Sequence, residues 1–276
     1  MGFIAGINRI IQLLGDTFRQ LFRGRIWLIL LAYYAFQWLI LYGHEQFASP
    51  VFGWLASLTL SFKDANRATA FTHYPMHYVF LPDVYGNAKL VAGLFFEGLA
   101  LGAVAAAFQQ RFSRKVSGVP ATKLWLQLVV AWVVLNGLTL VLSYAVPAAL
   151  SSQLYSPKRV AVFSFIIMPA LFTICMALFY YSIPIVMITG RNGLYATGQA
   201  LKLFVRYPII TLVLSALVVA GPILVAAVSS GYATTIVDKF RPELVYWLLV
   251  VGLFLEMIAS FVWMGTASRL LVDELE

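Results

Sequence analysis

Six apolar runs, each long enough to cross a lipid bilayer, are the feature that most constrains the fold of this chain. They cover residues 26–43, 87–108, 124–147, 161–189, 208–229 and 244–266. A helix of about 20 residues spans the hydrocarbon core, and all its backbone hydrogen bonds form within the helix. Apolar residues make up 62% of the chain and charged residues 11%, whereas soluble domains carry roughly 25% charged residues. The sequence therefore predicts an all-α polytopic membrane bundle of six transmembrane helices, forming a single membrane domain over residues 1–276.

The basic residues between these runs predict the orientation of the chain. With a cytoplasmic N-terminus, twelve basic residues fall on the inner side: Arg9, Arg19, Arg23, Arg25, Arg111, Arg114, Lys115, Lys123, Arg191, Lys202, Arg206 and Arg269. Seven fall on the outer side: Lys63, Arg67, Lys89, Lys158, Arg159, Lys239 and Arg241. Because inner loops carry the excess of positive charge, we expect both termini in the cytoplasm, in a bacterial inner membrane. The net charge of +8 comes from these dispersed residues, so we expect no nucleic-acid partner.

Two inner segments have the pattern of helices that lie on a membrane surface. In residues 1–24 the apolar side chains recur at a spacing of three or four: Ile7, Ile10, Ile11, Leu14, Phe18, Leu21 and Phe22. Arg9, Arg19 and Arg23 occupy the other faces, so we expect these arginines to contact anionic lipid or a partner protein. Residues 193–207 form the second such segment, with Lys202 and Arg206 as its basic residues.

The longest polar segment, residues 44–86, is predicted to be an outer loop. It contains PVFGWLASLTLSF, residues 50–62, which is apolar but too short to span, so we expect it to lie on the membrane or to re-enter it. All three histidines fall in this loop: His44, His73 and His77. His73 and His77 could bind copper or zinc from one helical face, and the further ligands would come from His44, Met76, Asp64 or Asp83. The alternative is an aromatic loop packed on the membrane surface, and we predict no cofactor.

Glu97 and Glu256 are carboxylates inside predicted spans. At about 1.5 Å per residue, Glu97 lies roughly 10–16 Å and Glu256 roughly 18 Å below the outer edge of the membrane. Gln37 and Asn136 fall at a similar depth, so the four residues could form one polar layer. No Lys, Arg or His occurs at that depth in this reading. We therefore expect either protonated carboxyl groups that hydrogen-bond to Gln37, Asn136 or a backbone carbonyl, or a wet cavity that binds a proton, a cation or a cationic substrate.

Two further features bear on how the helices pack. Gly98 and Gly102 have the GxxxG spacing that allows two helices to approach closely, which favours a structural role for the neighbouring Glu97. Pro169, Pro184 and Pro222 lie within predicted spans, where a proline frees a backbone carbonyl and kinks the helix. Such kinks either shape the bundle for packing or act as hinges in a transporter.

Residues 180–217, YYSIPIVMITGRNGLYATGQALKLFVRYPIITLVLSAL, combine a span that contains a proline, a short polar turn, an amphipathic segment and the next span. This stretch resembles bacterial multi-span membrane proteins related to the membrane domain attached to some glycerophosphodiester phosphodiesterases. The resemblance covers less than a fifth of the chain. It implies a membrane module and carries over no catalytic residue.

Enzyme motifs such as the P-loop, G-x-S-x-G and H-E-x-x-H do not occur in the sequence, so we expect a protein that is not an enzyme. The first hypothesis is a non-catalytic inner-membrane subunit of a larger membrane assembly. The second is a permease or transporter subunit with a polar site at the membrane midplane, proton-coupled or similar to the membrane subunit of an ABC exporter with residues 109–123 as its coupling loop. The third is a metal- or cofactor-binding subunit that uses the outer histidines.

Overall fold

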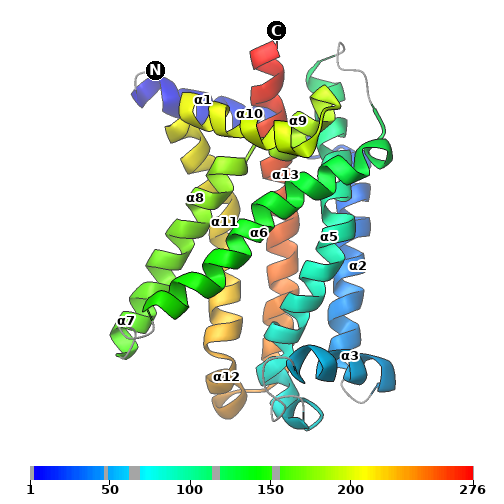
Figure 1. Ribbon diagram of the computed structural model, residues 1–276, viewed down its shortest axis with the longest axis vertical. Helices are drawn as coiled ribbons and strands as arrows, with labels where there is room; N and C mark the ends of the chain where they lie inside the picture. Colours follow the sequence, from blue (N-terminus) through cyan, green and yellow to red (C-terminus); the bar gives the residue numbers. More distant parts are fainter. Residues whose placement is uncertain (1–2, 47–48, 62–68, 114–118, 151–155, 276) are drawn as a thin grey trace. The chain divides into compact units, whose positions relative to one another are not determined.

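The computed structural model describes residues 3–46, 49–61, 69–113, 119–150 and 156–275, and the regular elements in these residues are helices (Figure 1). In chain order they are α1 (Phe3–Phe18), α2 (Gly24–Glu45), α3 (Pro50–Ser61), α5 (Met76–Phe112), the 3-10 turn η1 (Ala121–Leu124), α6 (Trp125–Leu150), α7 (Pro157–Val162), the π-helical turn η3 (Phe163–Ile167), α8 (Met168–Phe179), α9 (Ser182–Thr189), α10 (Gly193–Arg206), α11 (Pro208–Gly231), α12 (Ala233–Lys239) and α13 (Leu244–Leu275).

Six helical stretches in the described part of the chain are long and apolar enough to cross a membrane. They are Gly24–Glu45, Met76–Phe112, Ala121–Leu150, Lys158–Thr189, Pro208–Gly231 and Leu244–Glu274. Each contains one of the six runs predicted from the sequence. The prediction of an all-α polytopic membrane bundle is therefore confirmed, and the chain is an integral membrane protein.

The helices pack as two compact units. Unit 1 comprises Met1–Leu31, Leu94–Ala220 and Ile258–Glu276, and unit 2 comprises Ala32–Gly93 and Gly221–Met257. The helices α2, α5, α11 and α13 each contribute one part to each unit. The single membrane domain over residues 1–276 stays a prediction from the sequence.

Aromatic side chains fill part of the core of unit 1. Phe108 of α5 and Phe261 of α13 are buried, and their ring centroids are 5.3 Å apart. Trp27 of α2 stacks on Phe261 with 5.0 Å between centroids. Gly265 of α13 leaves room for Thr17 of α1, because a Cβ at Gly265 would overlap the Thr17 side chain. These contacts join α1, α2, α5 and α13 within the unit.

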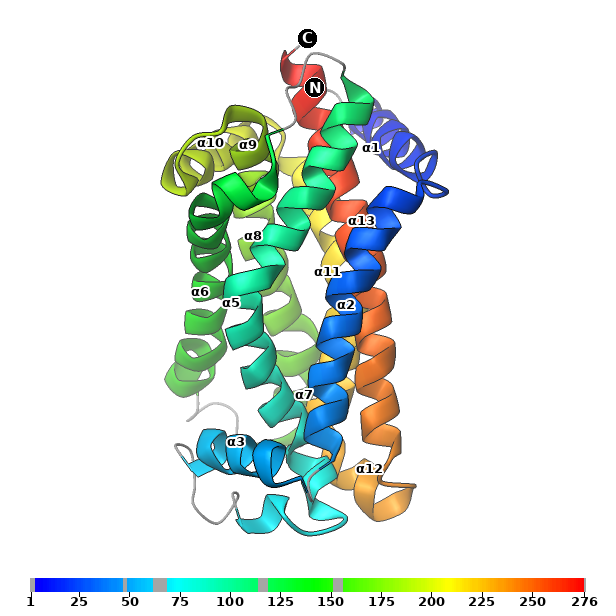
Figure 2. The ribbon, with the colours of Figure 1, turned by 90° about the vertical axis from the view of Figure 1, so that its right-hand side faces the viewer.

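The two surface helices predicted from the sequence are present in unit 1 as α1 and α10. Both run crosswise to the long helices of this unit (Figures 1 and 2). They bury Ile10 and Leu13 in α1 and Ala196 and Ala200 in α10. Their outer faces expose six large apolar side chains: Ile7, Ile11, Phe18, Leu194, Leu201 and Val205. Exposed apolar side chains on crosswise helices are typical of helices that lie in the membrane interface.

The fourth span, Lys158–Thr189, is interrupted at the break between α8 and α9. Pro184 has no N–H, so the carbonyl of Tyr180, four residues earlier, loses its helical donor. The indole Nε1 of Trp263 in α13 donates to this carbonyl at 2.7 Å. Gln109 Nε2 in α5 donates to the carbonyl of Pro184 itself at 2.8 Å. Side chains from two neighbouring helices therefore satisfy the backbone at the kink that Pro184 predicts.

The sequence TGRNG determines how α9 ends and α10 begins. Gly190 follows α9 with φ of 64°, a left-handed conformation that glycine adopts without steric cost. Asn192 then caps α10 by accepting a hydrogen bond from the backbone N–H of Leu194 at 3.0 Å. This tight connection allows α10 to turn away from α9 after only three residues.

In unit 2, much of the segment 44–86, which the sequence predicts to be an outer loop, is helical. The helix α3 covers Pro50–Ser61, and α5 begins at Met76 instead of residue 87. In the first turns of α5, four buried side chains recur at helical spacing: Tyr78, Leu81, Val84 and Tyr85. Their packing outweighs the low intrinsic helix propensity of Pro82 and Gly86, which both lie inside α5. α3 runs across the ends of α2 and α5 (Figure 2), and its Ala56 packs in a buried cluster with Phe71 and Val84.

Candidate functional site

Glu97, on α5 in unit 1, accepts a hydrogen bond from the indole Nε1 of Trp132 on α6 at 3.0 Å. Asn136, one of the partners expected from the sequence, donates its Nδ2 to the Trp132 carbonyl of its own helix at 3.2 Å. Hydrogen bonds between side chains of neighbouring spans hold helices together where no water competes. The Glu97–Trp132 bond therefore links α5 to α6.

Gly98 and Gly102 lie beside Glu97 at the contact between α5 and α6. A Cβ at Gly98 would come within 3.0 Å of the Leu128 carbonyl oxygen, and one at Gly102 within 2.7 Å of Leu128 Cδ1. Glycine at these two positions therefore favours the close packing of α5 against α6. This close approach brings Trp132 within hydrogen-bonding reach of Glu97.

Glu256, on α13 in unit 2, forms an ion pair with Lys89 on α5. The sequence interpretation expected no protein cation at the depth of Glu256, and this expectation was wrong. It placed Lys89 at the outer end of a span beginning at residue 87, whereas α5 begins eleven residues earlier, at Met76. Lys89 therefore lies within the helix, and its flexible stem carries the ammonium group to the carboxylate. The side chains remain 26% and 25% exposed.

The other two members of the predicted polar layer bond within their own helices. Gln37, in unit 2, is fully buried and donates Nε2 to the Tyr33 hydroxyl at 2.8 Å. Its Oε1 has no hydrogen-bond partner among the described residues. Asn136, in unit 1, bonds to its own backbone as described above. The four residues are thus divided between the units, with Glu97 and Asn136 in one and Gln37 and Glu256 in the other.

The three histidines have separate local partners in unit 2. His44 Nδ1 lies 2.7 Å from the Ile40 carbonyl oxygen, and His73 Nδ1 lies 2.9 Å from Thr72 Oγ1. The buried His77 ring packs against Tyr78 with 3.9 Å between centroids. Because α5 begins at Met76, His73 precedes the helix and the i, i+4 face needed for a shared metal does not form.

No group of three or more His, Cys, Asp or Glu side chains within the described residues is arranged to hold a metal ion. The predicted copper or zinc site at His73, His77 and His44 has no support among the described residues and stays a prediction. Asp64, which was one of its candidate ligands, lies outside the described residues. Residues 114–118 of the predicted coupling loop also lie outside them, and Gln109 at its start is a buried residue of α5.

The end of α13 in unit 1 carries a cluster of ion pairs, which we name the C-terminal charge cluster. It consists of Arg9, Asp16, Arg206, Tyr207, Arg269, Asp273 and Glu274. Arg9 of α1 pairs with Asp273, and Arg269 bonds Asp16 at 3.1 Å. On the side of α10, Arg206 pairs with Glu274. The cluster therefore joins both surface helices to the last span.

This cluster changes the interpretation of the arginines on α1. Arg9 was expected to face lipid or a partner, but it pairs with Asp273 inside the unit. Arg19, in the turn that follows α1, fits the expectation better, because its side chain is 81% exposed although it pairs with Asp16 at 3.1 Å. Arg23 is also exposed. The exposed basic residues next to α1 are therefore Arg19 and Arg23, in the turn between α1 and α2.

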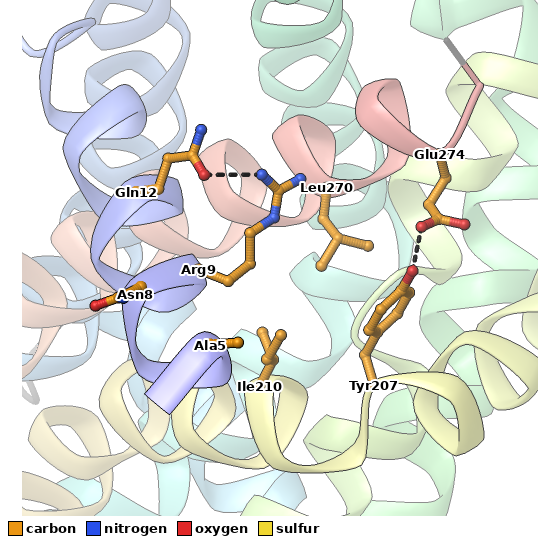
Figure 3. A pocket seen from close by; sticks show the side chains of 8 residues that line it. All are labelled: Ala5, Asn8, Arg9, Gln12, Tyr207, Ile210, Leu270 and Glu274. Carbon is orange, nitrogen blue, oxygen red and sulfur yellow. Dashed lines mark hydrogen bonds between the residues drawn. The ribbon is translucent and has the colours of Figure 1, made fainter. Parts of the chain in front are cut away.

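A pocket of about 500 Å³ opens beside this cluster, between α1, the start of α11 and the end of α13 (Figure 3). Eight residues line it: Ala5, Asn8, Arg9, Gln12, Tyr207, Ile210, Leu270 and Glu274. Arg9 bonds Gln12 Oε1 at 2.9 Å on one side, and Tyr207 donates to Glu274 on the other. This hydrogen bond to Glu274, together with partial burial, raises the pKa of the Tyr207 hydroxyl.

Sequence reasoning missed Trp132, Lys89 and the pocket pair Tyr207 and Glu274. A tryptophan in the middle of a span was a usable signal for Trp132, because a buried indole N–H needs an acceptor. The pocket had no such signal, because its residues come from three segments that are distant in sequence. Comparisons with protein-family models, with curated proteins and with solved structures find no match to this chain.

Proposed function

We propose that this chain is a non-catalytic subunit of a larger assembly in a bacterial inner membrane, with both termini in the cytoplasm. The observation that carries the proposal is the bonding of the two carboxylates inside spans. Glu97 accepts from Trp132, and Glu256 pairs with Lys89. Each carboxylate thus links α5 to another helix, which fits a structural role for both.

The surfaces available to partners and lipid lie on the crosswise helices. α1 and α10 together expose the six apolar side chains named above, and Phe22, just after α1, is 93% exposed. Arg19 and Arg23 supply positive charge next to them. A basic helix with an exposed apolar face binds an anionic leaflet or the groove of a partner. The resemblance of residues 180–217 to membrane modules related to glycerophosphodiester phosphodiesterases adds support, because it implies a membrane module without catalytic residues.

Extraction in a mild detergent, followed by affinity purification and size-exclusion chromatography with light scattering, tests this proposal. The expected result is a particle that contains other polypeptides at fixed stoichiometry. Glu97→Gln and Glu256→Gln should leave that composition unchanged, because glutamine retains an acceptor oxygen for Trp132 and Lys89. A wild-type particle made of this chain alone would overturn the proposal.

The same variants separate a subunit from a permease. In a permease with a midplane carboxylate, the glutamine substitutions would abolish transport and leave the particle intact. Reconstitution of the purified particle in proteoliposomes, with proton flux measured for the wild type and for both variants, gives this readout. A wild-type flux that either substitution removes would contradict the structural role of that carboxylate.

A further inference from the structure

The pocket between α1 and the end of α13 lies at the boundary of two spans. Tyr207 directly precedes the span Pro208–Gly231, and Glu274 is the last residue of the span Leu244–Glu274. The third wall is α1, whose Ile7 and Ile11 are exposed apolar side chains. Residues at span ends and on interfacial helices lie at the level of the lipid headgroups. The position of the pocket is therefore suited to a headgroup.

The two sides of the pocket offer opposite chemistry (Figure 3). On one side, the Arg9 guanidinium uses one N–H for Gln12 and another for Asp273. A guanidinium has five N–H groups, so three remain for a phosphate oxygen. On the other side, Glu274 accepts from Arg206 at one oxygen and from Tyr207 at the other. Each carboxylate oxygen has a second lone pair, which an ammonium N–H can use.

The charges around the pocket cancel. Of the eight residues that line the pocket, Arg9 and Glu274 carry a formal charge, and their charges are opposite. A site of zero net charge with separated signs favours a zwitterion over a simple anion or cation, because each end of a zwitterion meets its opposite. Figure 3 shows Leu270 and Ile210 between the two sides, where they form an apolar floor for the glycerol and the first acyl carbons.

We propose that this pocket binds the headgroup of a zwitterionic phospholipid with a primary ammonium, phosphatidylethanolamine, with its phosphate at Arg9 and Gln12 and its ammonium at Glu274. The volume of about 500 Å³ falls within the range of small-molecule sites. A trimethylammonium group has no N–H to donate, so phosphatidylcholine retains the phosphate contact and loses the hydrogen bond to Glu274. The bound lipid would connect α1 to α13 in addition to the ion pairs.

Native mass spectrometry of the full chain in detergent, titrated separately with dioleoyl phosphatidylethanolamine, phosphatidylcholine and phosphatidylglycerol, tests the proposal. We expect roughly tenfold tighter binding of phosphatidylethanolamine than of the other two lipids, which corresponds to one charge-assisted hydrogen bond. Glu274→Gln should reduce the preference over phosphatidylcholine to about unity. Glu243→Gln is the matched control, because Glu243 also accepts from a tyrosine, Tyr74, at 3.2 Å, but lies outside the pocket.

Since Glu274→Gln also removes the ion pair with Arg206, a second variant fills the pocket without changing a charge. Ala5→Trp should lower the binding of phosphatidylethanolamine about tenfold or more by occupying the space. Ile11→Trp, on the exposed face of the same helix, is its control and should leave binding unchanged. Equal binding of the three lipids by the wild type, or full binding by Ala5→Trp, would overturn the proposal.

A last binding measurement distinguishes a membrane lipid from a soluble metabolite with the same headgroup. Soluble glycerophosphoethanolamine should bind at least tenfold more weakly than the lipid, because it lacks the acyl chains that contact Ile210 and Leu270. Equal affinity for the two would show that the pocket takes a soluble zwitterion and would overturn the assignment to a lipid. Tighter binding of phosphatidylglycerol than of phosphatidylethanolamine would contradict the zwitterionic site.

Discussion

Trp263 donates its indole N–H to the carbonyl of Tyr180 at 2.7 Å, and this is the carbonyl that Pro184 deprives of its helical donor. The indole replaces a missing backbone N–H with a side chain from another helix. Both Tyr180 and Trp263 are buried, so no water is available to do the same. The bond therefore couples the shape of the fourth span to the position of α13 within unit 1.

Trp263→Phe should destabilise the protein by roughly 1–3 kcal/mol, because the Tyr180 carbonyl is left buried without a donor. Pro184→Ala in the same chain restores a backbone N–H at position 184 and should recover part of that loss. Denaturant titration in mixed detergent micelles measures the four free energies of the double-mutant cycle. Strictly additive effects of the two substitutions would show that Trp263 and Pro184 do not act on the same carbonyl.

Gly98→Ala should destabilise unit 1 by roughly 1–3 kcal/mol, because the new methyl group would press on the backbone of α6, which cannot rotate away. The limiting contact is the 3.0 Å approach to the Leu128 carbonyl oxygen. Gly137→Ala on α6 is the control, since a Cβ there meets nothing within 4 Å. This control should be neutral or stabilising by up to about 1 kcal/mol through helix propensity. Thermal unfolding of both variants in detergent gives the comparison, and equal midpoints would refute the close packing at Gly98.

Lys89→Met should cost more stability than the double substitution of Lys89 and Glu256 by methionine. The single change leaves the Glu256 carboxylate without its cation, whereas the double change removes both charges. With about a quarter of each side chain exposed, the loss should fall between the roughly 0–1 kcal/mol of exposed pairs and the roughly 3–5 kcal/mol of buried ones. Denaturant titration of the wild type, the two single variants and the double variant measures the coupling. A coupling energy of zero would show that the ion pair between Lys89 and Glu256 does not stabilise unit 2.

Tyr207 should make stability fall at alkaline pH. Its pKa in the folded chain is raised by the hydrogen bond to Glu274 and by partial burial, whereas an unfolded tyrosine titrates near pH 10. A raised folded pKa contributes stability that is complete below about pH 10 and is lost as the pH rises through the folded pKa. The stability difference between the wild type and Tyr207→Phe should therefore shrink from about pH 10 upward. Thermal unfolding of both proteins between about pH 8 and pH 11 tests this, and a constant difference would contradict it.

The sequence by itself determined the spans and the surface helices of this protein. Apolar runs fix where a backbone can enter lipid, and the 3/4 spacing in residues 1–24 fixes an amphipathic helix, since both signals are local. Pro184 likewise predicted the site of a kink, and the TGRNG turn follows from the conformational freedom of Gly190.

Only the tertiary structure decided which side chains form hydrogen bonds or ion pairs with the polar groups inside the spans. Lys89 was placed at the outer end of a span beginning at residue 87, whereas α5 begins at Met76, where Tyr78, Leu81 and Tyr85 are buried. The hydrogen-bond donor to the Tyr180 carbonyl is Trp263, and the pocket is lined by Arg9 together with Leu270 and Glu274. Such partners are far apart along the chain, and no local preference encodes them, because they follow from the way the helices pack.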